Sequence, residues 1–341
     1  MMTSKNPKRR IIPKELRFIL SIGLVFFIFE YFVVPQLTTA SKSLRVLIHI
    51  NPLLAGLAIF LEIFSIWAYA ELTKVVLTPH SPRRRDILRV NLSSLALGHI
   101  LPGGTATAGA LNYRLYSNLG VPASTNGFGL AVQGSGSAVV LNVIFWVALV
   151  VSIPLRGFNP AYGFAALAGV FLLLIFFGIV ILLTRGQKYA ETVLRRTIGR
   201  IPRLDPDRIT ALLESIAERI NMLLRTRKIL TASLIWAAAN WLLDAASLWT
   251  FLWAFGYPIS PIDLFVAYGL ANILAVLPFT PGGLGVVEGV LIPTIVGFGV
   301  PHAPAILAVL LYRLINFWLP IPLGGISYLT LRWSGKTQAS E

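Results

Sequence analysis

The sequence contains no cysteine, which excludes disulfide bonds and thiolate metal sites. Charged residues are also scarce: they make up 13% of the chain, against about 25% in an ordinary soluble domain. A soluble protein of 341 residues needs a polar surface that this composition does not provide. With 56% hydrophobic residues and a mean hydropathy of +0.75, the chain is predicted to be an all-α integral membrane protein.

The signature motifs of soluble enzymes are missing as well. The chain has no Gly-x-Ser-x-Gly motif, no phosphate-binding P-loop and no His-Glu-x-x-His motif. The histidines are scattered without ligand spacing and are interpreted as interfacial or packing residues: His49, His80, His99 and His302. We therefore expect no catalytic residue, no metal and no cofactor, and we expect that the chain is not an enzyme.

Positive charge is plentiful but is confined to a few places. Of 29 Lys and Arg residues, 24 fall into four clusters, which lie before Phe18, between Lys74 and Arg89, between Arg185 and Lys228, and after Leu331. A net charge of +15 suggests nucleic acid in a soluble protein. Basic clusters between apolar stretches instead follow the positive-inside rule. We therefore predict a cytoplasmic membrane protein with both termini in the cytoplasm, anionic lipids as partners and no nucleic-acid partner.

Several apolar stretches have the length that a membrane-spanning helix needs. We predict about six spans, at residues 18–37, 46–72, 121–153, 161–183, 229–255 and 303–331. The first could also be a signal peptide, but it is long for one and contains Glu30, which favours a retained span. The polar segment 185–228 has apolar residues at helical spacing. It is interpreted as an amphipathic helix at the cytoplasmic interface or as a helix that caps the bundle.

Two further segments, 86–120 and 261–299, mix apolar with small and polar residues and are broken in the middle. The first break is Pro102-Gly103-Gly104 and the second is Pro281-Gly282-Gly283. Each half is too short to cross a bilayer, so we predict two re-entrant helical hairpins. Broken backbone at membrane depth is tolerated only inside protein or beside a wet cavity.

The two broken segments match each other. An offset of 179 residues places Pro102 on Pro281 and Gly120 on Gly299 without a gap. This spacing indicates a duplication. We predict a first repeat at 18–153 and a second at 161–331, each with two spans, a hairpin and a span, between a basic N-terminus (1–17) and a tail (332–341). The predicted sides of the spans give the repeats opposite topology, which is typical of transporters whose site lies where the broken helices meet.

Candidate substrate-binding residues lie at the breaks and among the charges within the apolar segments. They are Pro102, Gly103, Gly104, Arg114, Pro281, Gly282, Gly283, Glu288, Tyr312 and Arg313. Helix N-termini after the breaks attract anions such as phosphate. We expect Arg114 and Arg313 to face the protein interior and to hold a phosphate, while a carboxylate such as Glu288 balances them in the empty state. The alternatives are that the breaks are simple tight turns and that the charges form structural ion pairs or snorkel. Glu62 and Asp244 are candidate charge partners.

Three motifs resemble a known family. They are His99-Ile100-Leu101-Pro102-Gly103-Gly104, the segment from Leu277 to Glu288 (LPFTPGGLGVVE), and Leu311-Tyr312-Arg313. They resemble the lysylphosphatidylglycerol synthase transmembrane family, the flippase-like domain of multipeptide-resistance proteins. The resemblance implies a membrane domain that handles phospholipids or polyprenyl-linked lipids. Members with synthase activity carry a further soluble aminoacyltransferase domain, which this sequence does not contain, so we do not expect lysyl transfer.

The leading hypothesis is a flippase or transporter that moves an anionic lipid headgroup, phospho- or polyprenyl-phosphate-linked, across the cytoplasmic membrane. The alternative is a non-transporting membrane subunit that scaffolds or regulates a lipid-modifying or glycosylating enzyme, with 185–228 as a cytoplasmic docking surface. A weaker option is an intramembrane enzyme that uses Glu288 or Asp244 as a base. The sequence predicts no particular oligomeric state.

Overall fold

The computed structural model describes residues 50–101, 104–156, 226–275 and 280–338, with a few single residues between 170 and 218. These residues form helices and short connections, with no strand among them. The predicted all-α membrane fold is confirmed. The predicted span 18–37 lies outside the described residues, as do most of the span 161–183 and of the polar segment 185–228.

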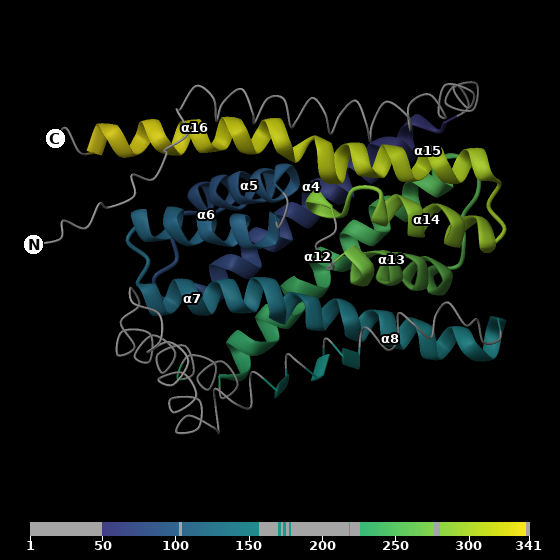
Figure 1. Cartoon of the computed structure of the whole chain (residues 1–341), viewed down its shortest axis with the longest axis horizontal. Coiled ribbons are helices and arrows are strands. Elements are labelled where there is room, and N and C mark those ends of the chain that lie inside the picture. Colours follow the sequence, from purple (N-terminus) through teal and green to yellow (C-terminus); the bar gives the residue numbers. More distant parts are fainter. Residues whose placement is uncertain are drawn as a thin grey trace, which may run out of the picture. The chain divides into compact units, whose positions relative to one another are not determined.

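The described helices form two successive series with the same layout (Figure 1). The first series comprises α4 (Pro52–Val76), α5 (Arg84–Ile100), α6 (Gly104–Asn118), α7 (Ala123–Ala131), the π-helical turn η2 (Val132–Gly136) and α8 (Ser137–Arg156). The second comprises α12 (Arg227–Ala254), α13 (Pro261–Ala275), the 3₁₀ turn η3 (Pro281–Gly283), α14 (Val286–Gly297), α15 (His302–Arg313), the π-helical turn η4 (Leu314–Trp318) and α16 (Pro320–Gln338).

Four helical stretches in the described part are long and apolar enough to cross a membrane: Pro52–Val76, Ala123–Ser152, Arg227–Ala254 and His302–Arg332. They correspond to the spans predicted at 46–72, 121–153, 229–255 and 303–331. The π-helical turn η2 lies within the second of these, and the last helix continues to Gln338, into the predicted tail. A helix rises about 1.5 Å per residue, so the shortest stretch, with 25 residues, exceeds the thickness of a hydrocarbon core.

The first broken segment forms two helices, α5 and α6, that lie side by side (Figure 1). Gly98 and Gly104 bring their backbones together: a Cβ placed on Gly104 would collide with the carbonyl oxygen of Gly98. Glycine is therefore required at this crossing. A half-helix was predicted to begin directly after Gly104, and α6 begins one residue earlier, at Gly104 itself, whereas Pro102 and Gly103 lie outside the described residues.

The second broken segment turns by means of left-handed glycines. Gly282, Gly283 and Gly285 have φ angles of 53°, 70° and 78°, which L-residues with a side chain rarely adopt. The half-helix α14 begins at Val286 with Gly285 as its N-cap. The prediction that this helix begins directly after Gly283 is therefore wrong by two residues, because the chain first makes the η3 turn.

The helix ends of the two series correspond at the offset seen in the sequence. Asn118, the last residue of α6, falls on Gly297, the last residue of α14, and the first residues of α7 and α15 correspond in the same way. Gly120 and Gly299 both follow these helices with positive φ, 81° and 97°. In both places the next residue donates its N–H to a carbonyl five residues earlier, which is the Schellman helix end. The duplication predicted from the sequence therefore extends to the backbone.

The packing between the two series is reciprocal. Helix α4 packs against its counterpart α12, α5 of the first series packs against α16 of the second, and α13 of the second packs against α8 of the first. Such an exchange of equivalent partners is the pattern expected when two halves are related by a two-fold axis.

Candidate functional site

The second break packs against the helices that flank the first. The η3 turn contacts both α5 and α6. A Cβ added at Gly282 would lie 3.3 Å from the Cα atom of His99 and would collide with the ring of Phe317. The tight approach therefore needs glycine at this position, and the second break meets α5 and α6, the helices that flank the first, in one region of the bundle.

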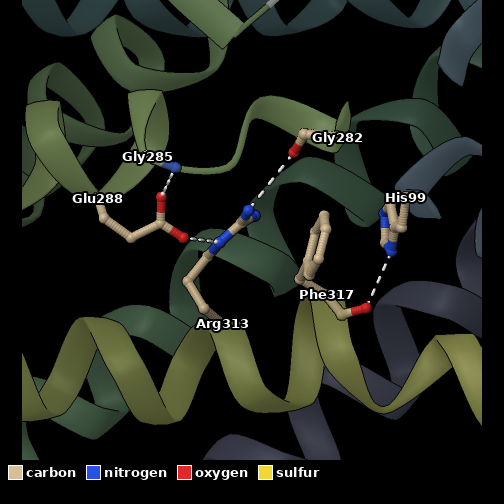
Figure 2. Close-up of polar contacts among 6 residues, drawn as sticks. All are labelled: His99, Gly282, Gly285, Glu288, Arg313 and Phe317. Carbon is tan, nitrogen blue, oxygen red and sulfur yellow. Dashed lines mark hydrogen bonds and ion pairs between the residues drawn. The ribbon is translucent and has the colours of Figure 1, made fainter. Parts of the chain in front are cut away.

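Arg313 lies at this meeting point (Figure 2). Its side chain is 6% exposed, and Nε lies 2.6 Å from Oε1 of Glu288. Nη2 donates to the carbonyl oxygen of Gly282 at 3.4 Å, and the guanidinium carbon lies 4.4 Å from the centre of the Phe317 ring. The arginine thus joins the last span to the second break through a buried ion pair.

Glu288 has a second role in the same arrangement. Its Oε2 accepts the backbone N–H of Gly285 at 2.7 Å, so the carboxylate caps the N-terminus of α14. Helix N-termini stabilise negative charge. Glu288 is 4% exposed, so one buried carboxylate satisfies both the helix end and Arg313.

His99 closes the site from the side of the first hairpin (Figure 2). Its ring stacks on the Phe317 ring with centroids 4.2 Å apart. Nδ1 lies 2.9 Å from the carbonyl oxygen of Phe317, and because a carbonyl only accepts, Nδ1 carries the hydrogen. Of the two roles predicted for the histidines, interfacial or packing, His99 has the packing role, and its contacts with Phe317 join α5 to η4.

Comparison with known proteins decides the family. The family described as "Lysylphosphatidylglycerol synthase TM region" matches residues 15–324. The chain belongs to this family.

Relatives of this family member include the inner membrane protein YbhN of Escherichia coli K12, which is 22% identical over 98% of this chain and 97% of its own length. A UPF0104 membrane protein of Methanothermobacter thermautotrophicus is 27% identical over 34% of this chain, and one of Pyrococcus horikoshii is 27% identical over 32%. The chain aligns with only 35% and 33% of these two archaeal proteins. The family resemblance inferred from the three motifs is thereby confirmed.

This family member also has a second buried polar cluster, which we call the acid cluster: Glu62, Asp244, Tyr268, Tyr312 and Asn316. Nδ2 of Asn316 donates to Oε1 of Glu62 at 3.1 Å and to Oδ1 of Asp244 at 2.9 Å. The hydroxyls of Tyr268 and Tyr312 both donate to Oδ2 of Asp244. Glu62 and Asp244 are 2% and 6% exposed. The two candidate charge partners therefore lie beside each other, and Asp244 feels the charge of Arg313.

Arg114 does not lie in the interior. It is exposed on α6 and forms no ion pair with the described residues, so the expectation of an inward-facing arginine is wrong. Asn112 and Tyr116, two residues to either side, are buried. Residues i and i+4 share one face of a helix, so Arg114 between them points to the other face.

Four of the other candidates have side-chain or backbone contacts in the two clusters. Gly282, Glu288 and Arg313 come together at the break, whereas Tyr312 turns to Asp244. Sequence reasoning missed Tyr268, Asn316 and Phe317. The only local signal was the position of Asn316 and Phe317 one turn after Arg313, which places all three on one side of a helix.

Proposed function

We propose that the chain moves an anionic lipid headgroup, phospho- or polyprenyl-phosphate-linked, across the cytoplasmic membrane, and that Arg313 binds its phosphate. The observation that carries the proposal is the buried Arg313–Glu288 pair where the second break meets α5 and α6. A buried arginine within a membrane-spanning helix is costly and marks a functional path more often than a surface arginine does.

The contacts of Arg313 support an exchange of anions. Glu288 engages Nε, and Nη2 has only a long contact to Gly282, which leaves Nη1 without a partner among the described residues. A guanidinium binds phosphate through two parallel N–H groups. The carboxylate of Glu288 then acts as the internal anion of the empty state, and an incoming phosphate takes its place at Arg313.

The membrane location supports the same function. The four basic clusters of the sequence follow the positive-inside rule with both termini in the cytoplasm. YbhN, similar over nearly the full length, is named an inner membrane protein. An inverted repeat with broken helices is the architecture through which transporters alternate access to a central site.

The test is lipid movement in liposomes that contain the purified full-length protein. The probes are fluorescent phosphatidylglycerol, a fluorescent aminoacylated phosphatidylglycerol and a polyprenyl phosphate. We expect protein-dependent movement of at least one of them, measured by quenching of the outer leaflet. If none of the three moves, the proposal is overturned.

Arg313→Lys sharpens the assignment of the site. Lysine keeps the charge that Glu288 needs, but it loses the planar fork. Losing one charge-assisted hydrogen bond of about 1.5 kcal/mol lowers the rate by about tenfold. The matched control is Arg84→Lys, because Arg84 pairs with Glu71 at 2.7 Å but is 59% exposed. Equal rates in the wild type and Arg313→Lys would remove Arg313 from the transport path.

A further inference from the structure

One helical turn connects the Arg313 site to the acid cluster. Tyr312 and Arg313 are the last residues of α15, and Asn316 lies in the π-helical turn η4 that follows. Tyr312 and Asn316 bond to Asp244, while Arg313 bonds to Glu288. π-helical turns often mark functional positions because they redirect side chains within a helix. Any movement of this turn therefore changes both sites together.

The acid cluster has one feature that its own side chains do not explain. Oε2 of Glu62 is buried and accepts no hydrogen bond from the described residues. Its other oxygen shares the single Nδ2 of Asn316 with Asp244. A buried carboxylate oxygen without a donor is costly, and a second carboxylate beside it raises that cost. A proton on Glu62 removes both costs, because it neutralises one charge and gives the carboxyl group an O–H to donate.

We propose that the Glu62–Asp244 pair binds one exchangeable proton and that this proton is coupled to the binding of the lipid phosphate at Arg313. The coupling rests on the proposed function, whereas the proton site does not. In the step itself, a proton from water joins one carboxylate to form a carboxylic acid, and it leaves by the reverse reaction on the other side of the membrane. No other atom or electron is exchanged.

The charges around the pair set the direction of the coupling. Tyr268 from α13 and Tyr312 from α15 donate neutral hydroxyls to Asp244, and Arg313 is the cation whose charge acts on Asp244. Without the proton, the pair carries two negative charges that compete with phosphate for Arg313. With the proton, one of these charges is gone and the phosphate binds more readily. Proton and lipid anion therefore bind together and cross in the same direction.

The proton site can be tested without any lipid. In a maltoside detergent, which has no ester carbonyl, infrared difference spectra recorded over a pH series should contain the band of a buried protonated carboxyl group. We expect the band in the wild type and in the control Glu71→Gln, a variant of the same helix α4 outside the cluster. We expect it to disappear in Glu62→Gln or in Asp244→Asn. A wild-type protein without a titrating carboxyl band would overturn the proton site, and this result needs no variant to fold.

The coupling is tested in liposomes with fluorescent phosphatidylglycerol. An acidic lumen should speed outward movement of the lipid in the wild type and in Glu71→Gln, whereas Glu62→Gln should respond to the pH gradient no more than protein-free liposomes do. Equal wild-type rates with and without the gradient would overturn the coupling. So would a dependence on sodium against choline at constant pH, because the cation would then be sodium. If no lipid moves while the carboxyl band titrates, the proton site is supported and the transport function is the part that fails.

Discussion

The two repeats have the same helix boundaries, but they differ in the side chains at equivalent positions. At the offset of 179 residues, Glu288 falls on Gly109 and Arg313 falls on Gly134. The same helix boundaries and helix ends thus hold a buried ion pair in one repeat and two glycines in the other. The duplicated backbone fixes where the breaks lie, while side chains of the second repeat alone supply the ion pair beside them.

The acid cluster is asymmetric in a different way, because it takes one carboxylate from each repeat and neither has an acidic counterpart. Asp244 of α12 falls on Ser65 of α4, and that serine only exchanges hydrogen bonds with Asn240 across the helix pair. Glu62 of α4 falls on Trp241, which donates to the carbonyl and hydroxyl of Ser137. A symmetric backbone can adopt two equivalent conformations. A single set of buried charges can act as the same site in both of them. For the carrier that we propose, this difference favours one central site rather than two.

The largest contrast concerns the side of the membrane on which equivalent residues lie. Ala123 and His302 are the exposed first residues of α7 and α15, at equivalent positions in the two repeats. The inverted topology predicts that Ala123 faces the cytoplasm and His302 the outside. Because the chain has no cysteine, an impermeant maleimide should label His302→Cys in intact cells and leave Ala123→Cys unlabelled.

Permeabilised cells provide the control for this experiment, since both cysteines should then react. Labelling of both or of neither in intact cells would contradict opposite orientations of the repeats. The duplicated helices would then share a topology, and the central site of an inverted repeat would lose its basis.

The second-largest expected effect is a loss of stability when the buried ion pair of the second repeat is broken. Arg313→Gln leaves the carboxylate of Glu288 buried without its cation, which costs about 3–5 kcal/mol. The apparent stability against denaturant in detergent micelles should fall accordingly. Glu288→Gln in the same protein should restore part of it, because no unpaired charge remains.

The Arg84–Glu71 pair of the first repeat is the matched comparison. Its carboxylate is buried like that of Glu288, but its arginine is 59% exposed. Water screens an ion pair whose cation is exposed, so this pair contributes less to stability than a fully buried one. Arg84→Gln should therefore change the same stability by far less than Arg313→Gln. A similar loss in both variants would mean that the burial of Arg313 does not set its energetic role.

The elements that could be predicted from the sequence are those with a local signal. The breaks are marked by proline and glycine, and the repeat by an ungapped offset, because both properties are carried by residue type and spacing. The Arg313–Glu288 pair was foreseen as one of two outcomes, since a buried guanidinium needs an anion.

What the sequence could not predict depends on contacts between distant segments. Asn316 reaches Glu62 and Asp244 on two other helices, so no spacing within its own helix indicates the bond. The prediction that Arg114 faces the interior is wrong because an isolated charge within an apolar segment does not have to be buried. Its buried neighbours Asn112 and Tyr116 define the inner face only once the partner helices are known.

The smallest expected effect concerns how the repeats pack on each other. In the first repeat α8 presents Phe145 to Gly269 of α13, whereas the equivalent position on α16 is Gly324, which approaches the backbone of Leu92 in α5. A side chain at Gly324 would have to move a backbone rather than a ring. Gly324→Val should therefore overpack this interface and lower the stability by about 1–3 kcal/mol.

Gly325 is the control, since a Cβ there meets nothing within 4 Å. Valine has the same effect on helix propensity at either position. If thermal unfolding shows that the Gly324→Val and Gly325→Val proteins are equally stable, the packing of α5 on α16 is not tight. The two helices would then separate easily, as two halves that rock against each other at this interface would require.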